Sequence, residues 1–156
     1  MFTLGGGNPR TMQTKFVGTN PDFIEIELSQ AFAILLDKKY IHQENALRFY
    51  AEFVAIHPFY DANGRIGRYI VDIYLQQHKY YVDWQSINRS HSKFLRKLNY
   101  CHSMRAKYKQ YLLQRDLSSV SYSSRNVYWE SVREKYIGYL LSFWCQFVES
   151  IDNLEI

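Results

Sequence analysis

The chain has 156 residues, a length that suits one domain with a hydrophobic core of its own. Hydrophobic residues make up 47% of the chain, which excludes a disordered tail, and no run of about 18 apolar residues predicts a membrane span. The net charge of +4 is mildly basic and does not by itself select a partner.

The cysteines and the first residues bear on the compartment. Cys101 and Cys145 lie far apart without metal-ligand spacing, so we expect free thiols rather than a disulfide or a zinc site. The opening MFTLGGGNPR lacks the charged and apolar regions of a secretory signal. A cytoplasmic protein is therefore expected.

The first structured segment is predicted to be a β-hairpin over residues 14–26. TKFVGTNPDFIEI reads as two short extended pieces around a turn that contains Gly, Asn and Pro. Such a hairpin is marginal alone and must pack on the helices that follow. From Ser29, a possible N-cap, the apolar period becomes helical.

Residues 43–77 predict two helices joined by a short loop. The first carries apolar positions at Leu47, Tyr50 and Phe53, and it should end near His57 because the residue before a proline is pushed out of the helical region. The second should open near residues 63–65 and be the central helix of the fold. Its expected apolar face consists of Ile66, Tyr69, Ile70, Ile73 and Tyr74.

Residues 88–152 predict two more long helices, separated by the serine-rich loop LSSVSYSSRN. The expected fold class is thus all-α, a helical bundle with a small N-terminal β-hairpin. A single domain over residues 1–156 is predicted.

The stretch HPFYDANGRIGR, residues 57–68, interrupts the two helices with polar groups and glycines. The first N–H groups of a helix lack intrahelical partners and carry the positive end of its dipole. Asn63 and Gly64 suit the backbone conformations that aim such groups at one point. This arrangement is typical of a phosphate site.

The charged residues of the stretch supply the remaining chemistry. Arg65 and Arg68 are three apart on one helix and suit phosphate oxygens. A carboxylate such as Asp61 beside phosphates commonly binds Mg²⁺. Histidine titrates near neutrality, so His57 could accept a proton from a hydroxyl. Each residue also has an ordinary structural explanation, but their chance assembly at this spacing is improbable.

HPFYDANGRIGR resembles the signature of the Fic family, HPFx[D/E]GNGRxxR. The resemblance implies a protein adenylyltransferase, a nucleotidyltransferase that moves AMP from ATP to a Ser, Thr or Tyr hydroxyl of a target protein and releases pyrophosphate. It makes His57 the general base and Asp61 the Mg²⁺ ligand. The residues that it assigns to the nucleotide and its phosphates are Asn63, Gly64, Arg65, Gly67 and Arg68. Phe59 would anchor the loop.

Two departures from the signature concern the chemistry. Ala62 stands where the family usually has glycine, which is strained if the backbone φ is positive there. In the related Doc branch a lysine replaces the residue equivalent to Gly64 and accompanies phosphate transfer. Because this chain has glycine, AMP transfer is favoured over phosphate transfer.

The resemblance also implies a target-docking flap and a means of restraint. The flap would be the hairpin, whose edge could pair with a target peptide; its residues would be Lys15, Phe16, Val17, Ile24, Glu25 and Ile26. The family's inhibitory motif [S/T]xxxE[G/N] does not occur in the sequence. The expectation is an inhibitory, antitoxin-like partner chain, an unrestrained enzyme or a shortened chain.

Several alternatives remain open. The transferred group could be UMP or phosphate, and a toxin-type module held by a partner is a further possibility, as is a homo-oligomer. The stretch from Arg89 to Gln110 holds seven Arg or Lys residues among aromatics, but a solvated helix face explains it more simply. Nucleic acid and membrane are therefore not expected partners.

Overall fold

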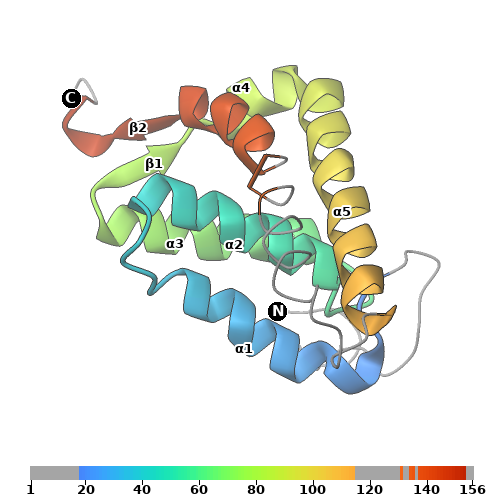
Figure 1. Cartoon of the computed structure of the whole chain (residues 1–156). Coiled ribbons are helices and arrows are strands. Elements are labelled where there is room, and N and C mark those ends of the chain that lie inside the picture. The colour runs from blue at the N-terminus through green and yellow to red at the C-terminus, as the bar shows by residue number, and fades with distance from the viewer. Residues whose placement is uncertain (1–17, 115–130, 132–133, 136, 154–156) are drawn as a thin grey trace. The chain divides into compact units, whose positions relative to one another are not determined.

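The computed structural model describes residues 18–114, 131, 134–135 and 137–153, which are mostly helical as predicted (Figure 1). Internal contacts divide the chain into two compact units. Unit 1 contains residues up to Asp83 together with those from Val148 onward, and unit 2 contains residues 84–147. Each unit is described by itself, and the single domain over residues 1–156 stays a prediction.

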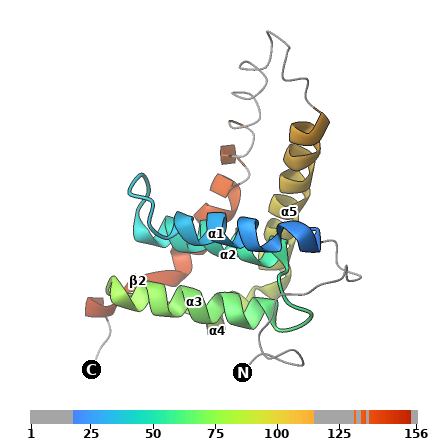
Figure 2. The same ribbon diagram turned by 90° about the horizontal axis from the view of Figure 1, so that it is seen from below.

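Unit 1 is built around three helices, α1 (Ile24–Ile34), α2 (His42–Ile56) and α3 (Asn63–Gln77). Helix α2 packs against both α1 and α3, as the two views show (Figures 1 and 2). The predicted helix–loop–helix over residues 43–77 is confirmed.

The most buried helix is α2 rather than α3. Leu47, Phe49 and Ile56 are fully buried along it, and Phe53 is 1% exposed. On α3 the expected apolar face is wrong in part, because Tyr69 is 67% exposed and Ile73 is 43% exposed. The buried face of α3 instead consists of Asn63, Gly67, Val71, Tyr74 and Leu75.

The predicted hairpin is wrong over its second arm. Residues Pro21–Phe23 form a 3₁₀ helix, η1, that leads into α1, while residues 14–17 lie outside the described residues. Local signals explain the difference, because the Asn20 side chain accepts from the Asp22 N–H at 3.0 Å and proline follows at the first helical position. Ser29 therefore lies within α1 and does not cap it.

A small antiparallel sheet completes unit 1. Strand β1 (Tyr80–Val82) pairs with β2 (Val148–Ser150), with Tyr80 opposite Ser150, and a short 3₁₀ helix, η3 (Ile151–Asn153), follows. The Ile151 N–H donates to the carbonyl of Lys79 at 2.8 Å. The last predicted helix is thus wrong over its final residues, because pairing with a distant strand decides their conformation.

Unit 2 contains α4 (Trp84–Arg89), α5 (His91–Gln114), the helical residues 137–144 and the 3₁₀ helix η2 (Cys145–Phe147). The Phe94 and Phe143 rings lie 5.9 Å apart, and those of Tyr100 and Tyr139 lie 6.2 Å apart. This order of contacts makes α5 and residues 137–144 antiparallel. Their buried side chains are Phe94, Leu98, Cys101, Ile137, Leu140, Phe143 and Trp144.

Two sequence expectations are answered by the described residues. Both cysteines are free thiols; Cys145 is exposed, and burial raises the pKa of Cys101 to about 12. None of the helices in the described part of the chain is long and apolar enough to cross a membrane.

Candidate active site

The site begins where α2 ends at His57. Pro58 excludes the right-handed helical conformation at the preceding residue, and His57 adopts a left-handed one with φ 53° and ψ 59°. Its N–H still donates to the carbonyl of Phe53 at 3.1 Å, which closes the last turn. The half-buried imidazole is therefore held at a defined helix end, as the sequence predicts.

Ala62 immediately precedes α3 and has φ 66° and ψ 16°. This is the positive φ that the sequence leaves open as a source of strain, because a Cβ makes left-handed backbone unfavourable. The turn then starts the helix, and the Ile66 N–H donates to the Ala62 carbonyl at 2.9 Å. The N–H groups of residues 63–65 precede this first intrahelical bond and point out of the helix end.

The buried side chain of Asn63 holds the loop by hydrogen bonds to its backbone. Its side-chain oxygen accepts from the Phe59 N–H at 2.9 Å, and its Nδ2 donates to the Phe59 carbonyl at 2.9 Å. These two bonds leave one orientation for the amide. Asn63 is only 5% exposed, and its side chain acts as a clamp on the loop, while the phosphate-binding role that the resemblance implies for it stays a prediction.

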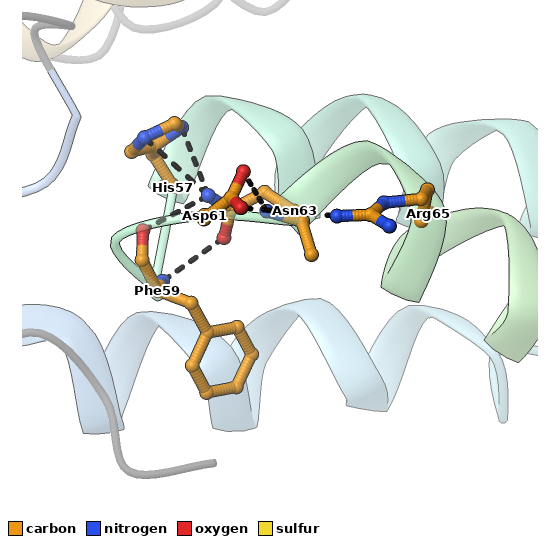
Figure 3. A network of polar contacts seen from close by, with 6 residues as sticks. His57, Phe59, Asp61, Asn63 and Arg65 are labelled. Atoms are coloured by element: carbon orange, nitrogen blue, oxygen red, sulfur yellow. Dashed lines mark hydrogen bonds and ion pairs between the residues drawn. The ribbon is translucent and has the colours of Figure 1, made fainter. Parts of the chain in front are cut away.

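The same amide positions the histidine. Nδ2 of Asn63 lies 3.2 Å from Nδ1 of His57 and 3.3 Å from Nε2 (Figure 3). One amide proton engages only one ring nitrogen at a time, so the contact orients the imidazole without requiring one tautomer. Sequence reasoning missed this link, because six residues of spacing do not predict a contact across a turn.

Asp61 and Arg65 form the outer, solvated part of the loop. The Asp61 Oδ1 accepts from the Ala62 N–H at 2.7 Å, and its Oδ2 lies 3.8 Å from the Arg65 guanidinium. The two side chains are 67% and 77% exposed. An exposed pair of this kind adds little stability, so both groups can turn to a ligand at small cost.

The two glycines of the stretch have different surroundings. A Cβ on Gly67 would lie 3.1 Å from a Phe53 ring carbon and 3.2 Å from the Tyr50 ring. Close approach of α2 and α3 therefore gives Gly67 a packing role, and its role toward the nucleotide stays a prediction. Among the described residues, a Cβ on Gly64 would meet only the Tyr50 hydroxyl, at 3.9 Å, so their packing does not require that glycine. Its missing side chain leaves room in front of the helix end.

Arg68 and Phe59 are the remaining motif residues with a defined position. Arg68 is half-buried one turn into α3, three residues after Arg65. The Phe59 ring points away from the polar groups and lies 6.5 Å from the Phe53 ring (Figure 3). This agrees with the anchoring role expected of Phe59. The structure thus brings His57, Asp61, Asn63 and Arg65 into one network.

The predicted docking residues do not form a strand edge. Ile24, in the first turn of α1, is 1% exposed and cannot contact a target. Glu25 and Ile26 are exposed on the same helix. Lys15, Phe16 and Val17 lie outside the described residues. The docking hairpin is therefore wrong over Ile24–Ile26.

Metal-binding side chains and a second cavity bear on the chemistry of the motif loop. Among the described residues, no three His, Cys, Asp or Glu side chains group together in a way that could hold a metal ion. A cavity of about 810 Å³ lies elsewhere in unit 1, lined by the end of α1, the loop after it and the outer face of α3. Its wall includes the stacked rings of His42 and His78; burial and the neighbouring His78 lower the pKa of His42.

Comparison with known proteins adds one match. The model of the Fic/DOC family matches residues 2–75, a range that contains α1, α2, the motif loop and most of α3. The comparisons with curated proteins and with solved structures found no match. The family match supports a Fic domain in this part of the chain, and hence an enzyme of the Fic type that transfers a nucleotide-linked group.

Proposed function

We propose that this Fic-type domain is a protein adenylyltransferase, which moves AMP from ATP to a hydroxyl side chain of a target protein. The observation that carries the proposal is the placement of His57, Asp61 and Arg65 around the start of α3. A proton acceptor, a carboxylate, a guanidinium and the open N–H groups of a helix then share one short loop. These groups suit transfer of a nucleotide-linked group to a hydroxyl, and Gly64 favours AMP over phosphate as that group.

His57 serves as the general base in this proposal. The target hydroxyl loses its proton to the imidazole as its oxygen attacks the α-phosphorus of ATP. The new P–O bond forms as the bond from the α-phosphorus to the bridging oxygen of the β-phosphate breaks, and pyrophosphate leaves. The contact between Asn63 and the ring limits the orientations that His57 can take, which lowers the entropic cost of reaching this geometry.

The start of α3 would hold the phosphates. The N–H groups of residues 63–65 and the helix dipole favour a negative charge there, and Gly64 leaves the space that a phosphate needs. Arg65 is exposed beside this space, and Arg68 is one turn further along. Arginine binds phosphate oxygens through two parallel hydrogen bonds, which orients as well as attracts.

Asp61 is the residue that fits a Mg²⁺ ion. Magnesium in phosphate sites uses one or two carboxylates, with phosphate oxygens and water as its other ligands, and Asp61 presents one exposed carboxylate beside the proposed phosphate site. When bound, the ion would neutralise charge that develops on the phosphates.

The test follows labelled ATP. With Mg²⁺ present, we expect label from the α-phosphate to enter the chain itself or proteins of a lysate, and label from the γ-phosphate to stay in pyrophosphate. His57→Ala should lower the transfer by about 10²- to 10⁴-fold, the usual contribution of a general base. His91→Ala, which removes an exposed histidine from unit 2, is the matched control and should leave transfer unchanged.

Each other result has a definite meaning. Transfer from the γ-position would replace the proposal by phosphate transfer, and preferred use of UTP would replace AMP by UMP. Absence of transfer from any nucleotide, in a folded protein that binds ATP, would overturn the enzyme and favour a module held by an inhibitory partner chain.

A further inference from the structure

The charges of the chain separate between its two units. Residues 84–147 contain eleven Lys and Arg against three Asp and Glu, a net charge of +8, whereas the rest of the chain has eight against twelve, a net charge of −4. No Asp or Glu occurs between Trp84 and Gln114. The mild +4 of the whole chain therefore hides a strongly basic unit. Such asymmetry is typical of a chain with a polyanionic partner.

Part of this charge gathers at a pocket of unit 2. The pocket has a volume of about 390 Å³ and is lined by Arg96, Tyr100, Lys135 and Tyr139. Arg96 and Tyr100 are four residues apart on α5, and Lys135 and Tyr139 are four apart on the facing segment. Each side thus contributes one cation and one tyrosine, a helical turn apart. Among the described residues, the lining contains no carboxylate.

The tyrosines of the pocket are presented rather than buried. Tyr100 is 50% exposed and Tyr139 is 56% exposed, and their rings meet at 69°. Below them Lys97 is only 8% exposed, and its Nζ lies 3.4 Å from the centre of the Tyr139 ring. This cation–π contact stabilises the position of the Tyr139 ring.

We infer that this pocket binds single-stranded nucleic acid, with phosphates on Arg96 and Lys135 and bases on Tyr100 and Tyr139. Binding of single strands combines cations that follow the backbone with aromatic rings on which bases stack. Both features occur here within one pocket. The inference is independent of the proposed transfer reaction, because it uses no residue of the motif loop.

Other polyanions fit the pocket less well. A duplex keeps its bases stacked on one another, so the exposed tyrosines would have no partner in it. An acidic polypeptide or an anionic membrane would use the charge of unit 2 but not the aromatic faces. The tyrosines therefore distinguish single-stranded nucleic acid from these alternatives.

The test measures binding of a fluorescent oligonucleotide of about 12 nucleotides to the whole chain. Arg96→Glu with Lys135→Glu should lower the affinity at least tenfold and reduce the slope of log affinity against log salt by about 1.4, since each single-strand phosphate contact contributes about 0.7. Lys39→Glu, an exposed lysine of unit 1, is the control for charge and should have little effect.

A second experiment tests the contribution of the two tyrosine rings to binding. Tyr100→Leu with Tyr139→Leu should lower the affinity about ten- to a hundredfold, whereas the matched Phe variants should stay within about twofold because stacking needs only the ring. If circular dichroism shows that the leucine variant does not fold, the charge-reversal variant and its Lys39→Glu control still test the inference.

Several results would overturn the inference. One is equal binding of polyglutamate or duplex DNA, and another is equal loss in the Lys39→Glu control. Displacement of the oligonucleotide by ATP would also count against it, because that would place the strand on the motif loop instead.

Discussion

The two halves of the motif loop differ in what surrounds them. His57, Phe59 and Asn63 form an inner half that is joined by hydrogen bonds, and Asn63 is 5% exposed. Asp61 and Arg65 form an outer half, with side chains 67% and 77% exposed and 3.8 Å apart. The inner half holds the shape of the loop, whereas the outer half presents charge to solvent.

The difference separates the residues that hold the loop from the two that present charge to solvent, while His57 belongs to the inner half and is also the proposed general base. Changes to the inner half should lower the free energy of unfolding, because they leave buried polar groups unsatisfied or disturb packing. Changes to the outer half should leave folding almost unchanged and affect only ligand binding and transfer. Four experiments on the loop and the helix that follows it, taken from the largest expected change in stability to the smallest, test this difference.

Asn63→Leu should destabilise the chain by about 2–4 kcal/mol, because both the N–H and the carbonyl of Phe59 lose their partner in a buried place. Urea unfolding measures the change. Asn99→Leu on the exposed face of α5 is the matched control and should cost less than about 0.5 kcal/mol. Equal effects of the two substitutions would show that the Asn63 side chain does not stabilise the loop.

Gly67→Ala should cost about 1–3 kcal/mol, since the new methyl group would stand 3.1 Å from the Phe53 ring. Gly64→Ala has space, so thermal unfolding should show little loss. Transfer from ATP should nevertheless fall in Gly64→Ala, because the methyl group enters the proposed phosphate site. A Gly67→Ala protein as stable as the original would mean that α2 and α3 do not need their close approach.

Ala62→Gly should stabilise the chain by about 1 kcal/mol, because glycine adopts the left-handed conformation observed at φ 66° without penalty. The same change at Ala33, exposed within α1, should destabilise by up to about 1 kcal/mol, as is usual for a helix interior. The opposite signs in thermal unfolding are the diagnostic. A loss of stability at both positions would contradict the positive φ.

Asp61→Asn and Arg65→Gln should each change the free energy of unfolding by less than about 0.5 kcal/mol, because their ion pair is exposed. Transfer should still fall about 10- to 10³-fold, because each removes a charge that the proposed reaction needs. In Asp61→Asn the remaining transfer should also need more Mg²⁺. If either substitution lowered the stability as much as Asn63→Leu does, the outer half of the loop would also be needed for folding, and the distinction between the halves would be wrong.

Local signals in the sequence predict much of the site but not its inner organisation. Pro58 predicts the end of α2, and the turn with Asn63 and Gly64 predicts the start of α3. The role of Asn63 was not predictable in the same way, because the motif suggests a phosphate ligand and only the folded turn directs the amide to Phe59 and His57. The packing role of Gly67 was not predictable either, because it depends on Phe53 and Tyr50 of α2.

The fold shows the same limit. Alternating apolar residues at Phe23, Ile24 and Ile26 suggest a strand, but Asn20 and Pro21 begin a helix there. Bulky residues suggest the wrong face for α3, because its close approach to α2 selects the side that carries Gly67. The pairing of β1 with β2 joins segments 68 residues apart, such as Tyr81 and Glu149, which no local window contains.

The sequence by itself therefore determined the helix boundaries around the motif, the helical class and the set of reactive groups, since these depend on neighbours along the chain. Only the tertiary structure decided which of these groups are buried and which are exposed to solvent, because burial depends on what packs against each face. It also decided that Arg96 of α5 and Lys135 of a distant segment meet two tyrosines at one pocket. Contacts between distant segments select among the arrangements that local preferences allow.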